Sequence, residues 1–516
     1  MTRPLFVCLL AACQSDGVAP QAACAPDRTF PYADGSPYTG VHGDPANSDV
    51  VDCDIADAFD RGWHALEGLG ITQPNTFSPD GLTTYLTSTN PDPMGCRVHA
   101  LDVATGRLRW CRTFPPSVSE SAVEVDEDGN LFLTYDGRVA SLAPTGEGRW
   151  SVALESSEAP WGIHFSPEGH VVTVTPSGVV YLIARSDGAI LSTLSIQDSW
   201  GFVEAENVEL LLDPALVFPP SVLGDLEQVF GSTDGSEADS GASSFLGAGA
   251  FVDNTVGIAQ DGTLYVIGGG PDVDTGALVQ IRVEAGTLVP GWYAPTYKGS
   301  ATTPSISADG RWVVVGDGAS MDRFLSPEPT EAYVRVADIP ACDANTDPDP
   351  DPEVCGFALS HPLQRGPMMG APAILPDGTT VFYELGLDFA AEPDDRDVVA
   401  LTPTGTTLWE VALPDNLEWT SVITVTNDHL VGTATAVELS GESFLQLAFP
   451  RTADSVLMVL DRHTGETVFS SPIPDDASAT VTVGPQGELY VGMLGMMSLL
   501  ATDVRPTLGL LRFNPR

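Results

Sequence analysis

One short segment recurs along most of the chain and constrains its fold more than any other feature. Each copy has a turn such as Pro-Asp-Gly, a β-rich run, and a second turn, Thr-Gly in several copies, followed by Trp. The clearest copy contains Asp80-Gly81, then Thr105-Gly106, and ends at Trp110. Self-similar segments mark a repeat architecture, and the 51 Gly and 42 Pro suit many short strands joined by tight turns. The pattern predicts an all-β fold, a β-propeller.

The number of blades can be counted from the first turn of each repeat. Apolar β-branched or aromatic runs follow most of these turns, as at residues 264–267 and 312–315. Near-continuous apolar strands are typical of sheets buried on both faces. We predict an eight-bladed β-propeller of four-stranded antiparallel blades over residues 59–516. The eight turns are Asp80-Gly81, Asp128-Gly129, Glu168-Gly169, Asp261-Gly262, Asp309-Gly310, Asp377-Gly378, Asn427-Asp428 and Gln486-Gly487.

Large aromatic residues close several repeats. Trp110, Trp150 and Trp409 each follow a turn that contains Thr-Gly. A flat side chain at a fixed position after a hairpin can bury roughly 200 Å² between blades. We interpret these tryptophans, together with Trp63, as inter-blade docking residues and not as a ligand-stacking site.

The two ends of the chain supply complementary pieces of one blade. The last repeat, from Thr482 to Asn514, stops before a closing Trp strand, whereas the segment around Trp63 resembles the one around Trp150. We predict that residues 61–69 form the outer strand of the last blade. Such closure removes the exposed sheet edges that invite aggregation.

These repeats resemble the tryptophan-docking repeats of quinoprotein alcohol dehydrogenase-like propellers, whose pattern is Ala-x-Asp-x-x-Thr-Gly-x-x-x-Trp. Residues 100–110 match it at every fixed position, and partial copies extend the resemblance over residues 60–516. The resemblance implies a mostly eight-bladed ring and, in the dehydrogenases, pyrroloquinoline quinone held beside a disulfide between adjacent cysteines. No Cys-Cys pair occurs in this sequence, so we expect no quinone cofactor. The chain also looks similar to bacterial envelope lipoproteins with such propellers.

The N-terminus has the features of an export signal with a lipid-attachment site. A basic start precedes a short apolar run, and Leu-Ala-Ala-Cys13 looks like the lipobox of bacterial lipoproteins. We predict a signal peptide over residues 1–12, lipidation of Cys13 and a tether over residues 13–58. A buried strand is the alternative interpretation of the apolar run. No other stretch reaches the about 18 apolar residues that span a bilayer, so the expected location is the bacterial cell envelope, on the periplasmic or surface face of the outer membrane, with the lipid as the only membrane contact.

The charge balance restricts the partners of this chain. It has 70 Asp plus Glu against 22 Lys plus Arg, a formal net charge of -48. Such a surface repels nucleic acid and anionic lipid headgroups and favours cations and basic partners. Solubility in a salty habitat is the other interpretation of this charge.

Cysteine usage agrees with export. With Cys8 and Cys13 set aside, six cysteines remain, an even number. We favour pairing between sequence neighbours because each bond then closes a local loop. No pair has CxxC spacing, so we expect neither redox nor zinc chemistry. The expected pairs are Cys24–Cys53, Cys96–Cys111 and Cys342–Cys355.

Two regions depart from the repeat. Residues 197–256 form an insertion that could instead hold a degenerate extra blade, and residues 341–355 form an acidic loop. Alternate oxygen-bearing side chains in this loop can converge on Ca²⁺, which takes about six to eight oxygens. An extended, solvated loop held at its base by a disulfide is the alternative. The candidate calcium ligands are Asp343, Asn345, Asp347, Asp349 and Asp351.

A second polar cluster lies near the entry to the ring. His42, Asp44, Asn47 and Asp49 occur within eight consecutive residues. A histidine with nearby carboxylates can act as a metal site or an acid–base pair. A hydrogen-bonded cap over the end of the propeller is the alternative interpretation.

The sequence lacks the common catalytic motifs. It has no GxSxG, P-loop or HExxH pattern. We therefore expect a non-enzymatic binding or scaffold protein, monomeric and lipid-anchored, whose partner is an envelope or surface protein, a cationic ligand or a glycan. The alternative is an enzyme, an oxidoreductase or hydrolase, with its site in the central channel.

Overall fold

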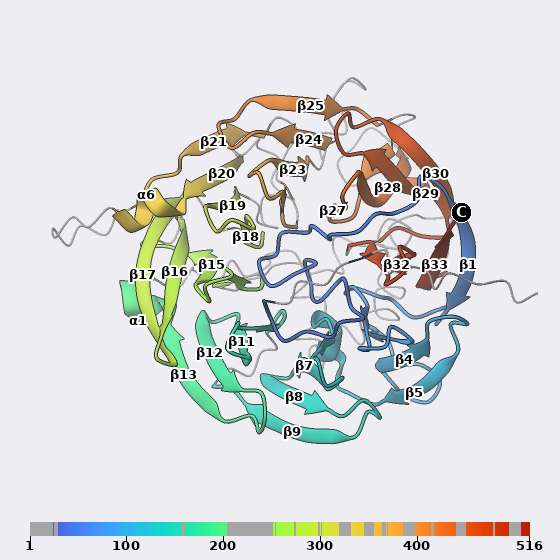
Figure 1. Cartoon of the computed structure of the whole chain (residues 1–516), viewed down its shortest axis with the longest axis horizontal. Helices are drawn as coiled ribbons and strands as arrows, with labels where there is room; N and C mark the ends of the chain where they lie inside the picture. The colour runs from blue at the N-terminus through green and yellow to red at the C-terminus, as the bar shows by residue number, and fades with distance from the viewer. Residues whose placement is uncertain are drawn as a thin grey trace, which may run out of the picture.

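The chain folds into a closed ring of eight β-sheets (Figure 1). Among the residues that the structure describes, the only α-helices are α1 (Ile196–Trp200) and α6 (Ile339–Ala344). There is also one 3-10 helix, η1 (Pro116–Glu120). Neither α-helix has the length and apolar character needed to cross a bilayer. The computed structural model describes residues 24, 29–155, 160–203, 251–252, 254–272, 275–297, 300, 302–318, 332–344, 355–363, 368, 370–384, 398–413, 417–439, 450–477, 480–494 and 507–516.

Each blade is an antiparallel sheet whose strands run in sequence from the centre of the ring outward. The first four blades are β2 (Thr76–Phe77), β3 (Thr83–Thr87), β4 (Val98–Asp102) and β5 (Leu108–Arg112); β6 (Glu124–Val125), β7 (Leu131–Tyr135), β8 (Arg138–Leu142) and β9 (Gly148–Ala153); β10 (His164–Phe165), β11 (His170–Val174), β12 (Val179–Ala184) and β13 (Ile190–Ser195); and β14 (Gly257–Ile258), β15 (Leu264–Gly269), β16 (Gly276–Glu284) and β17 (Thr287–Thr296).

The other four blades follow the same order, with an extra short strand in blade 7, where both β26 and β27 pair with β28. They are β18 (Ser305–Ile306), β19 (Trp312–Asp317), β20 (Tyr333–Asp338) and β21 (Leu359–Pro362); β22 (Ala373–Ile374), β23 (Thr380–Tyr383), β24 (Val398–Leu401) and β25 (Thr407–Val411); β26 (Leu417–Trp419), β27 (Thr424–Val425), β28 (His429–Leu439), β29 (Pro450–Asp461) and β30 (Thr467–Ile473); and β31 (Thr482–Val483), β32 (Leu489–Met493), β33 (Gly509–Pro515) and β1 (Phe59–Ala65).

The predicted fold is confirmed, including the count of eight blades. The eighth blade is closed by β1, which pairs antiparallel with β33 and places Arg61 opposite Phe513. The predicted boundary of the closing strand, residues 61–69, is shifted: the strand covers Phe59–Ala65. It ends where Leu66 and Gly68 take positive φ angles of 55° and 85° and turn the chain.

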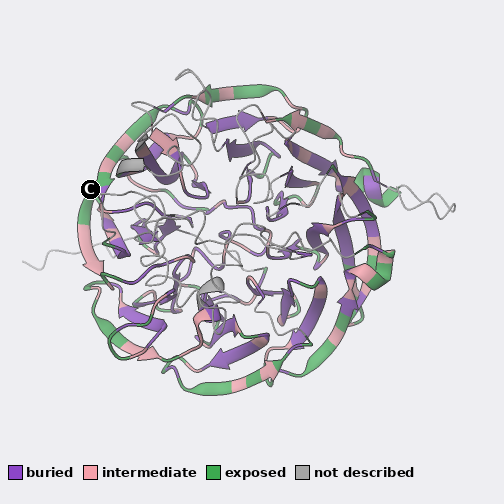
Figure 2. Ribbon diagram, turned by 180° about the vertical axis from the view of Figure 1, so that it is seen from behind, coloured by how far each residue is buried: buried purple, intermediate pink, exposed green. Residues whose placement is uncertain are grey.

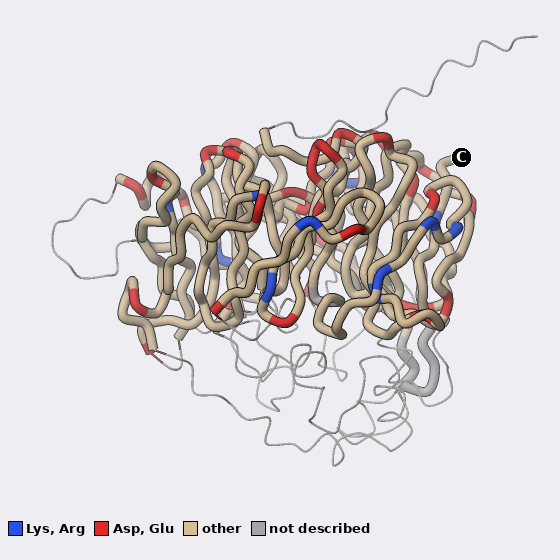
Figure 3. The backbone as a smooth tube through the Cα atoms, turned by 90° about the horizontal axis from the view of Figure 1, so that it is seen from below, with Lys and Arg blue, Asp and Glu red and all other residues tan. Residues whose placement is uncertain are grey.

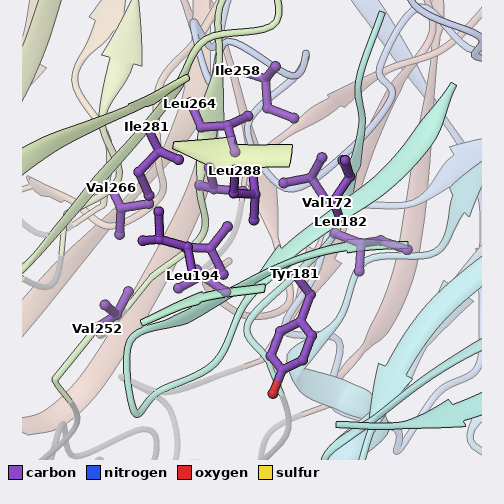
Figure 4. Packing of buried hydrophobic residues seen from close by; sticks show 14 of the residues in the cluster. Val172, Tyr181, Leu182, Leu194, Val252, Ile258, Leu264, Val266, Ile281 and Leu288 are labelled. Carbon is purple, nitrogen blue, oxygen red and sulfur yellow. The ribbon is translucent and has the colours of Figure 1, made fainter. Parts of the chain in front are cut away.

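The core lies in layers between neighbouring blades. Inner strands such as β3 and β32 are buried at every position, whereas the outer strand β9 alternates between exposed and partly buried residues. Figure 2 shows this gradient from a buried centre to an exposed rim. Figure 4 shows one such layer, where residues of blade 3 pack against residues of blade 4. The labelled residues are Val172, Tyr181, Leu182, Leu194, Val252, Ile258, Leu264, Val266, Ile281 and Leu288.

Four tryptophans each join the outer strand of one blade to the following blade. Each indole nitrogen donates a hydrogen bond of 3.0 Å to a backbone carbonyl of the next blade, and each ring covers the glycine of that blade's outer turn. Gly106 shows why glycine is needed: its φ is +67°, and an added Cβ would lie 2.6 Å from the Trp63 ring. The pairs are Trp63 with Val103, Trp110 with Pro144, Trp150 with Arg185, and Trp409 with Arg462. The recurring Trp and the recurring Gly are therefore two halves of one inter-blade contact.

Three disulfides staple local loops. Cys24 bonds to Cys53, Cys96 to Cys111 and Cys342 to Cys355. These are the sequence-neighbour pairs expected from the sequence. Of the insertion predicted at residues 197–256, positions 204–250 and 253 lie outside the described residues.

Replacing Trp63 with alanine tests the seam of the ring. We expect Trp63→Ala to lower the free energy of unfolding by about 2–3 kcal/mol, because the partly buried indole loses its packing on Gly106 and its bond to Val103. Urea unfolding followed by circular dichroism measures this loss. Leu108→Ala, on an outer strand at 39% exposure, is the control and should change stability by less than about 0.5 kcal/mol. Equal effects of the two substitutions would contradict the docking role.

Candidate functional site at the turn face

One end of the ring carries the acidic turns found in the sequence. We call this end the turn face, because it holds the turns between first and second strands and between third and fourth strands of the blades. The opposite end is the loop face. Asp261, Asp309 and Asp377 are exposed on the turn face, and each side chain accepts a backbone N–H two residues further along. Figure 3 shows Asp and Glu concentrated along this edge, which is uppermost in that view.

An N-terminal segment fills the middle of the turn face. We call Cys24 together with residues 29–58 the plug; it crosses the centre of the ring in Figure 1. In six blades the second residue of the innermost strand donates its backbone N–H to a plug oxygen at 2.6–3.1 Å. The donor and acceptor pairs are Phe77 to Ser36 Oγ, Phe165 to Tyr32 Oη, Ile258 to Pro45 O, Ile306 to Ala46 O, Ile374 to Ser48 O and Val425 to Asp49 O.

The plug also reaches the other two blades. In blade 2, the Ala33 N–H donates to Val125 O at 3.0 Å. In blade 8, plug residues Tyr38 and Val51 share an apolar cluster with Val483. The plug therefore contacts every blade, whereas the sequence predicted a tether over residues 13–58 with a cap only around His42.

The four polar residues predicted as one cluster, His42, Asp44, Asn47 and Asp49, form separate sets of hydrogen bonds within the plug. His42 Nδ1 lies 3.1 Å from Asp49 Oδ2, and His42 Nε2 lies 3.0 Å from the Thr303 hydroxyl of blade 5. Asp44 instead accepts from the backbone and hydroxyl of Ser48, while the Asn47 amide donates to backbone carbonyls of blades 4 and 5. These contacts hold the plug against the ring, as the cap interpretation requires.

Burial controls the protonation of Asp49. Its side chain is fully buried, and burial raises the pKa of its carboxyl above the ordinary value, although His42 opposes this shift. His42 itself is only 3% exposed. The Thr303–His42–Asp49 relay therefore lies out of contact with solvent, and a substrate could reach it only after the plug had moved.

A buried acid lies under the plug in blade 2, and the sequence reading missed it. Glu124 is fully buried, and its Oε1 lies 3.7 Å from His164 Nδ1 of blade 3. Burial raises the pKa of Glu124 well above its ordinary value, and burial together with the charge of His42 lowers the pKa of His164 to about 3. Both shifts favour the uncharged form of the group concerned. One signal was present: Glu124 occupies the first position of an innermost strand, where the other blades have no carboxylate.

A depression of about 240 Å³ lies between the plug and the turns of blades 4 to 6. Its polar lining includes Asp44 and Asp52 of the plug. The exposed turn carboxylates Asp261, Asp309 and Asp377 each follow a lining residue in the sequence, so they border the depression. The residues lining it from the blades are Ala259, Gln260, Ser307, Ala308, Ile374 and Pro376.

Most of the predicted calcium ligands lie outside the described residues. This holds for Asn345, Asp347, Asp349 and Asp351, and also for the lipidation candidate Cys13. Asp343 is described, and its Oδ1 accepts hydrogen bonds from the side chains of Gln280 at 3.0 Å and Trp292 at 2.9 Å. Asp343 thus ties α6 to blade 4.

Known structures share this fold. No family model matches the chain, and no curated protein matches its sequence. A europium-containing methanol dehydrogenase is 14% identical, with 93% of this chain and 97% of that chain covered and a TM-score of 0.54. The quinohemoprotein alcohol dehydrogenase of Comamonas testosteroni is 12% identical, with 94% and 81% covered and a TM-score of 0.53. BamB of Moraxella catarrhalis is 12% identical, with 89% and 100% covered and a TM-score of 0.47.

The likenesses to the two dehydrogenases confirm, at the level of fold, the resemblance read from the repeats. At such identities they carry no statement about activity. The quinone implied by the dehydrogenase resemblance does not fit this chain, because its sequence has no adjacent cysteines and the three disulfides join cysteines 29, 15 and 13 residues apart. We derive no chemistry through that cofactor.

The buried Glu124 predicts an unusual dependence of stability on pH. The pKa of Glu124 is raised in the folded state. The contribution of the protonated side chain to the free energy of unfolding is therefore complete below the unfolded-state pKa, and it is lost as the pH rises toward the folded-state pKa. Glutamine mimics the neutral acid and cannot ionise. We expect Glu124→Gln to match the wild type at about pH 4 and to melt at a higher temperature at about pH 8.

The matched control is Glu147→Gln, an exposed glutamate in the turn that follows β8. Calorimetry at both pH values compares the two variants with the wild type. A Glu124→Gln variant whose melting temperature differed from the wild type by the same amount at both pH values would show that folding does not shift the pKa of Glu124.

Proposed function

We propose that this chain is a lipid-anchored β-propeller of a bacterial cell envelope that acts as a non-enzymatic binding or scaffold protein. The observation that carries the proposal is the plug, which contacts all eight blades and occupies the turn-face end of the ring. A substrate entering the channel from this face would have to displace buried groups such as His42 and Asp49. This supports a role in binding over the alternative of a channel enzyme, an oxidoreductase or hydrolase.

The turn face is the surface that we assign to the partner. Its depression has a floor formed by the plug, and the exposed Asp261, Asp309 and Asp377 each follow a lining residue in the sequence. Charge complementarity sets the partner class and speeds its encounter. The partner is an envelope or surface protein, or a glycan, that presents basic groups to this rim.

The anchor is tested by changing the cysteine of the proposed lipobox. We expect Cys13→Ser to abolish incorporation of an alkyne-labelled fatty acid and to release the protein from the membrane fraction, because lipid attachment requires this thiol. Cys8→Ser removes the other cysteine of the same leader and should leave labelling intact. Labelling that survived in Cys13→Ser would refute the anchor.

Photo-crosslinking in intact envelopes tests the turn face as the binding surface. A photoreactive amino acid at the exposed Gln260, on the depression, should give an adduct with a discrete partner. The same group at the exposed Asp198, on the loop face, should give none. Equal adducts at both positions, or no adduct at Gln260, would contradict the proposal.

Charge variants then test how the partner is recognised. The triple variant Asp261→Asn, Asp309→Asn and Asp377→Asn keeps an acceptor for each turn while removing three charges. We expect about tenfold less adduct at Gln260, on the order of 0.5 kcal/mol for each charge. A matched triple on the loop face should have little effect; it consists of Glu155→Gln, Asp198→Asn and Asp272→Asn, all at exposed positions.

A further inference from the structure

Three side chains with metal-binding atoms gather in blade 1, away from the plug. The carboxylate of Asp92 and the sulfur atoms of Cys96 and Cys111 all lie within 4.8 Å of one another. Cys111 belongs to the outer strand β5, and the other two belong to the loop between β3 and β4. Among the residues that the structure describes, no other group of His, Cys, Asp and Glu side chains meets this condition.

The loop is built so that Asp92 faces the two cysteines. Its Oδ1 accepts hydrogen bonds of 2.8 Å from the backbone N–H groups of Met94 and Cys96, and its own N–H donates to the Cys96 carbonyl. The other carboxylate oxygen, Oδ2, lies 3.7 Å from Cys111 Sγ. Asp92 is only 8% exposed, so a negative oxygen is held against the disulfide in a largely dry position.

A buried imidazole lies on the same side of the sheet, just outside this group of three. His99 pairs directly with Cys111 across β4 and β5, and directly opposed residues project from one face. His99 is fully buried. Its Nε2 lies 3.1 Å from the Ser88 hydroxyl, whereas its Nδ1 has no hydrogen-bond partner among the described residues.

We propose that reduction of the Cys96–Cys111 disulfide turns this cluster into a zinc site, with ligands from Asp92, Cys96 and Cys111 and with His99 as the fourth ligand once its ring has moved toward the separated sulfurs. A thiol reductant supplies two electrons and two protons, the S–S bond breaks, and two thiols form while the reductant becomes a disulfide. Binding of Zn²⁺ then releases both thiol protons. Two sulfurs, one nitrogen and one carboxylate oxygen make the four-coordinate set that zinc accepts, with Zn–S bonds of about 2.3 Å.

The spacing of the two strands fits one ion. The Cα atoms of Cys96 and Cys111 are 5.7 Å apart, so both thiolates can reach one metal without movement of the backbone. The ion would then join the β3–β4 loop to β5 as the disulfide does in the oxidised chain. Blade 1 thus has a cross-link between this loop and β5 under both oxidising and reducing conditions. The amount of bound metal then depends on whether the disulfide is reduced.

Cobalt titration of the full chain tests the site, because Co²⁺ in a thiolate site gives intense absorption bands. After reduction with a phosphine, we expect uptake of about one equivalent with sulfur-to-cobalt charge transfer, and displacement by Zn²⁺. The oxidised protein should show no such bands. The paired control, Cys96→Ser with Cys111→Ser, keeps every other cysteine and should lose the signal. Identical titrations of this control and the reduced wild type would overturn the proposal.

Two further variants assign the remaining ligands. Asp92→Asn keeps the acceptor that caps the loop but loses the carboxylate, and we expect at least about tenfold weaker binding of Co²⁺. His99→Gln should weaken binding and shift the visible bands, because a nitrogen ligand is lost. Melting curves of the oxidised variants show whether each one folds. If one of these variants folds and binds cobalt as the wild type does, the residue that it replaces is not a ligand.

Discussion

The free inner edge of each blade is the constraint on which this ring depends. Strands pair within a blade, so the innermost strand is left with backbone groups that face the channel, and an unpaired buried N–H costs about 1–3 kcal/mol. In six blades a plug oxygen accepts this N–H, always from the second residue of the strand. The carbonyls of Pro45, Ala46, Ser48 and Asp49 serve four successive blades. The plug is therefore an integral part of the fold.

The acidity of the chain has a local structural cause as well as an electrostatic effect. Aspartates at the first turns accept backbone hydrogen bonds that shape those turns, as at Asp261, Asp309 and Asp377. Because the turns of all blades emerge at one end, their charges accumulate there (Figure 3). Under the plug, in blades 2 and 3, burial acts the other way: it raises the pKa of Glu124 and lowers that of His164, and so favours the uncharged form of each.

The periodic parts of this fold were predictable, and the non-periodic parts were not. Eight turns gave eight blades, and the unmatched segment around Trp63 identified the seam, because every blade repeats one pattern. The plug has no period, and its register against the blades is set in three dimensions, so residues 29–58 were interpreted as a tether. Glu124 is recognisable only when the innermost strands are compared. Pairing of sequence neighbours predicted that Cys96 and Cys111 meet, but Asp92 and His99 carried no motif that placed them beside this disulfide.

The pairing of β1 with β33 governs how such a chain can be made. Phe59 lies opposite Pro515, 456 positions later in the sequence, so blade 8 is complete only when these two distant segments have met. Contacts of such long range slow folding and leave unfinished surfaces open to association. During synthesis or transport across a membrane, a chain in which β1 has not yet docked would leave Gly106 of blade 1 without the Trp63 ring that covers it. The seven residues of β33 (Gly509–Pro515) thus commit the whole molecule to its circular state when they pair with β1.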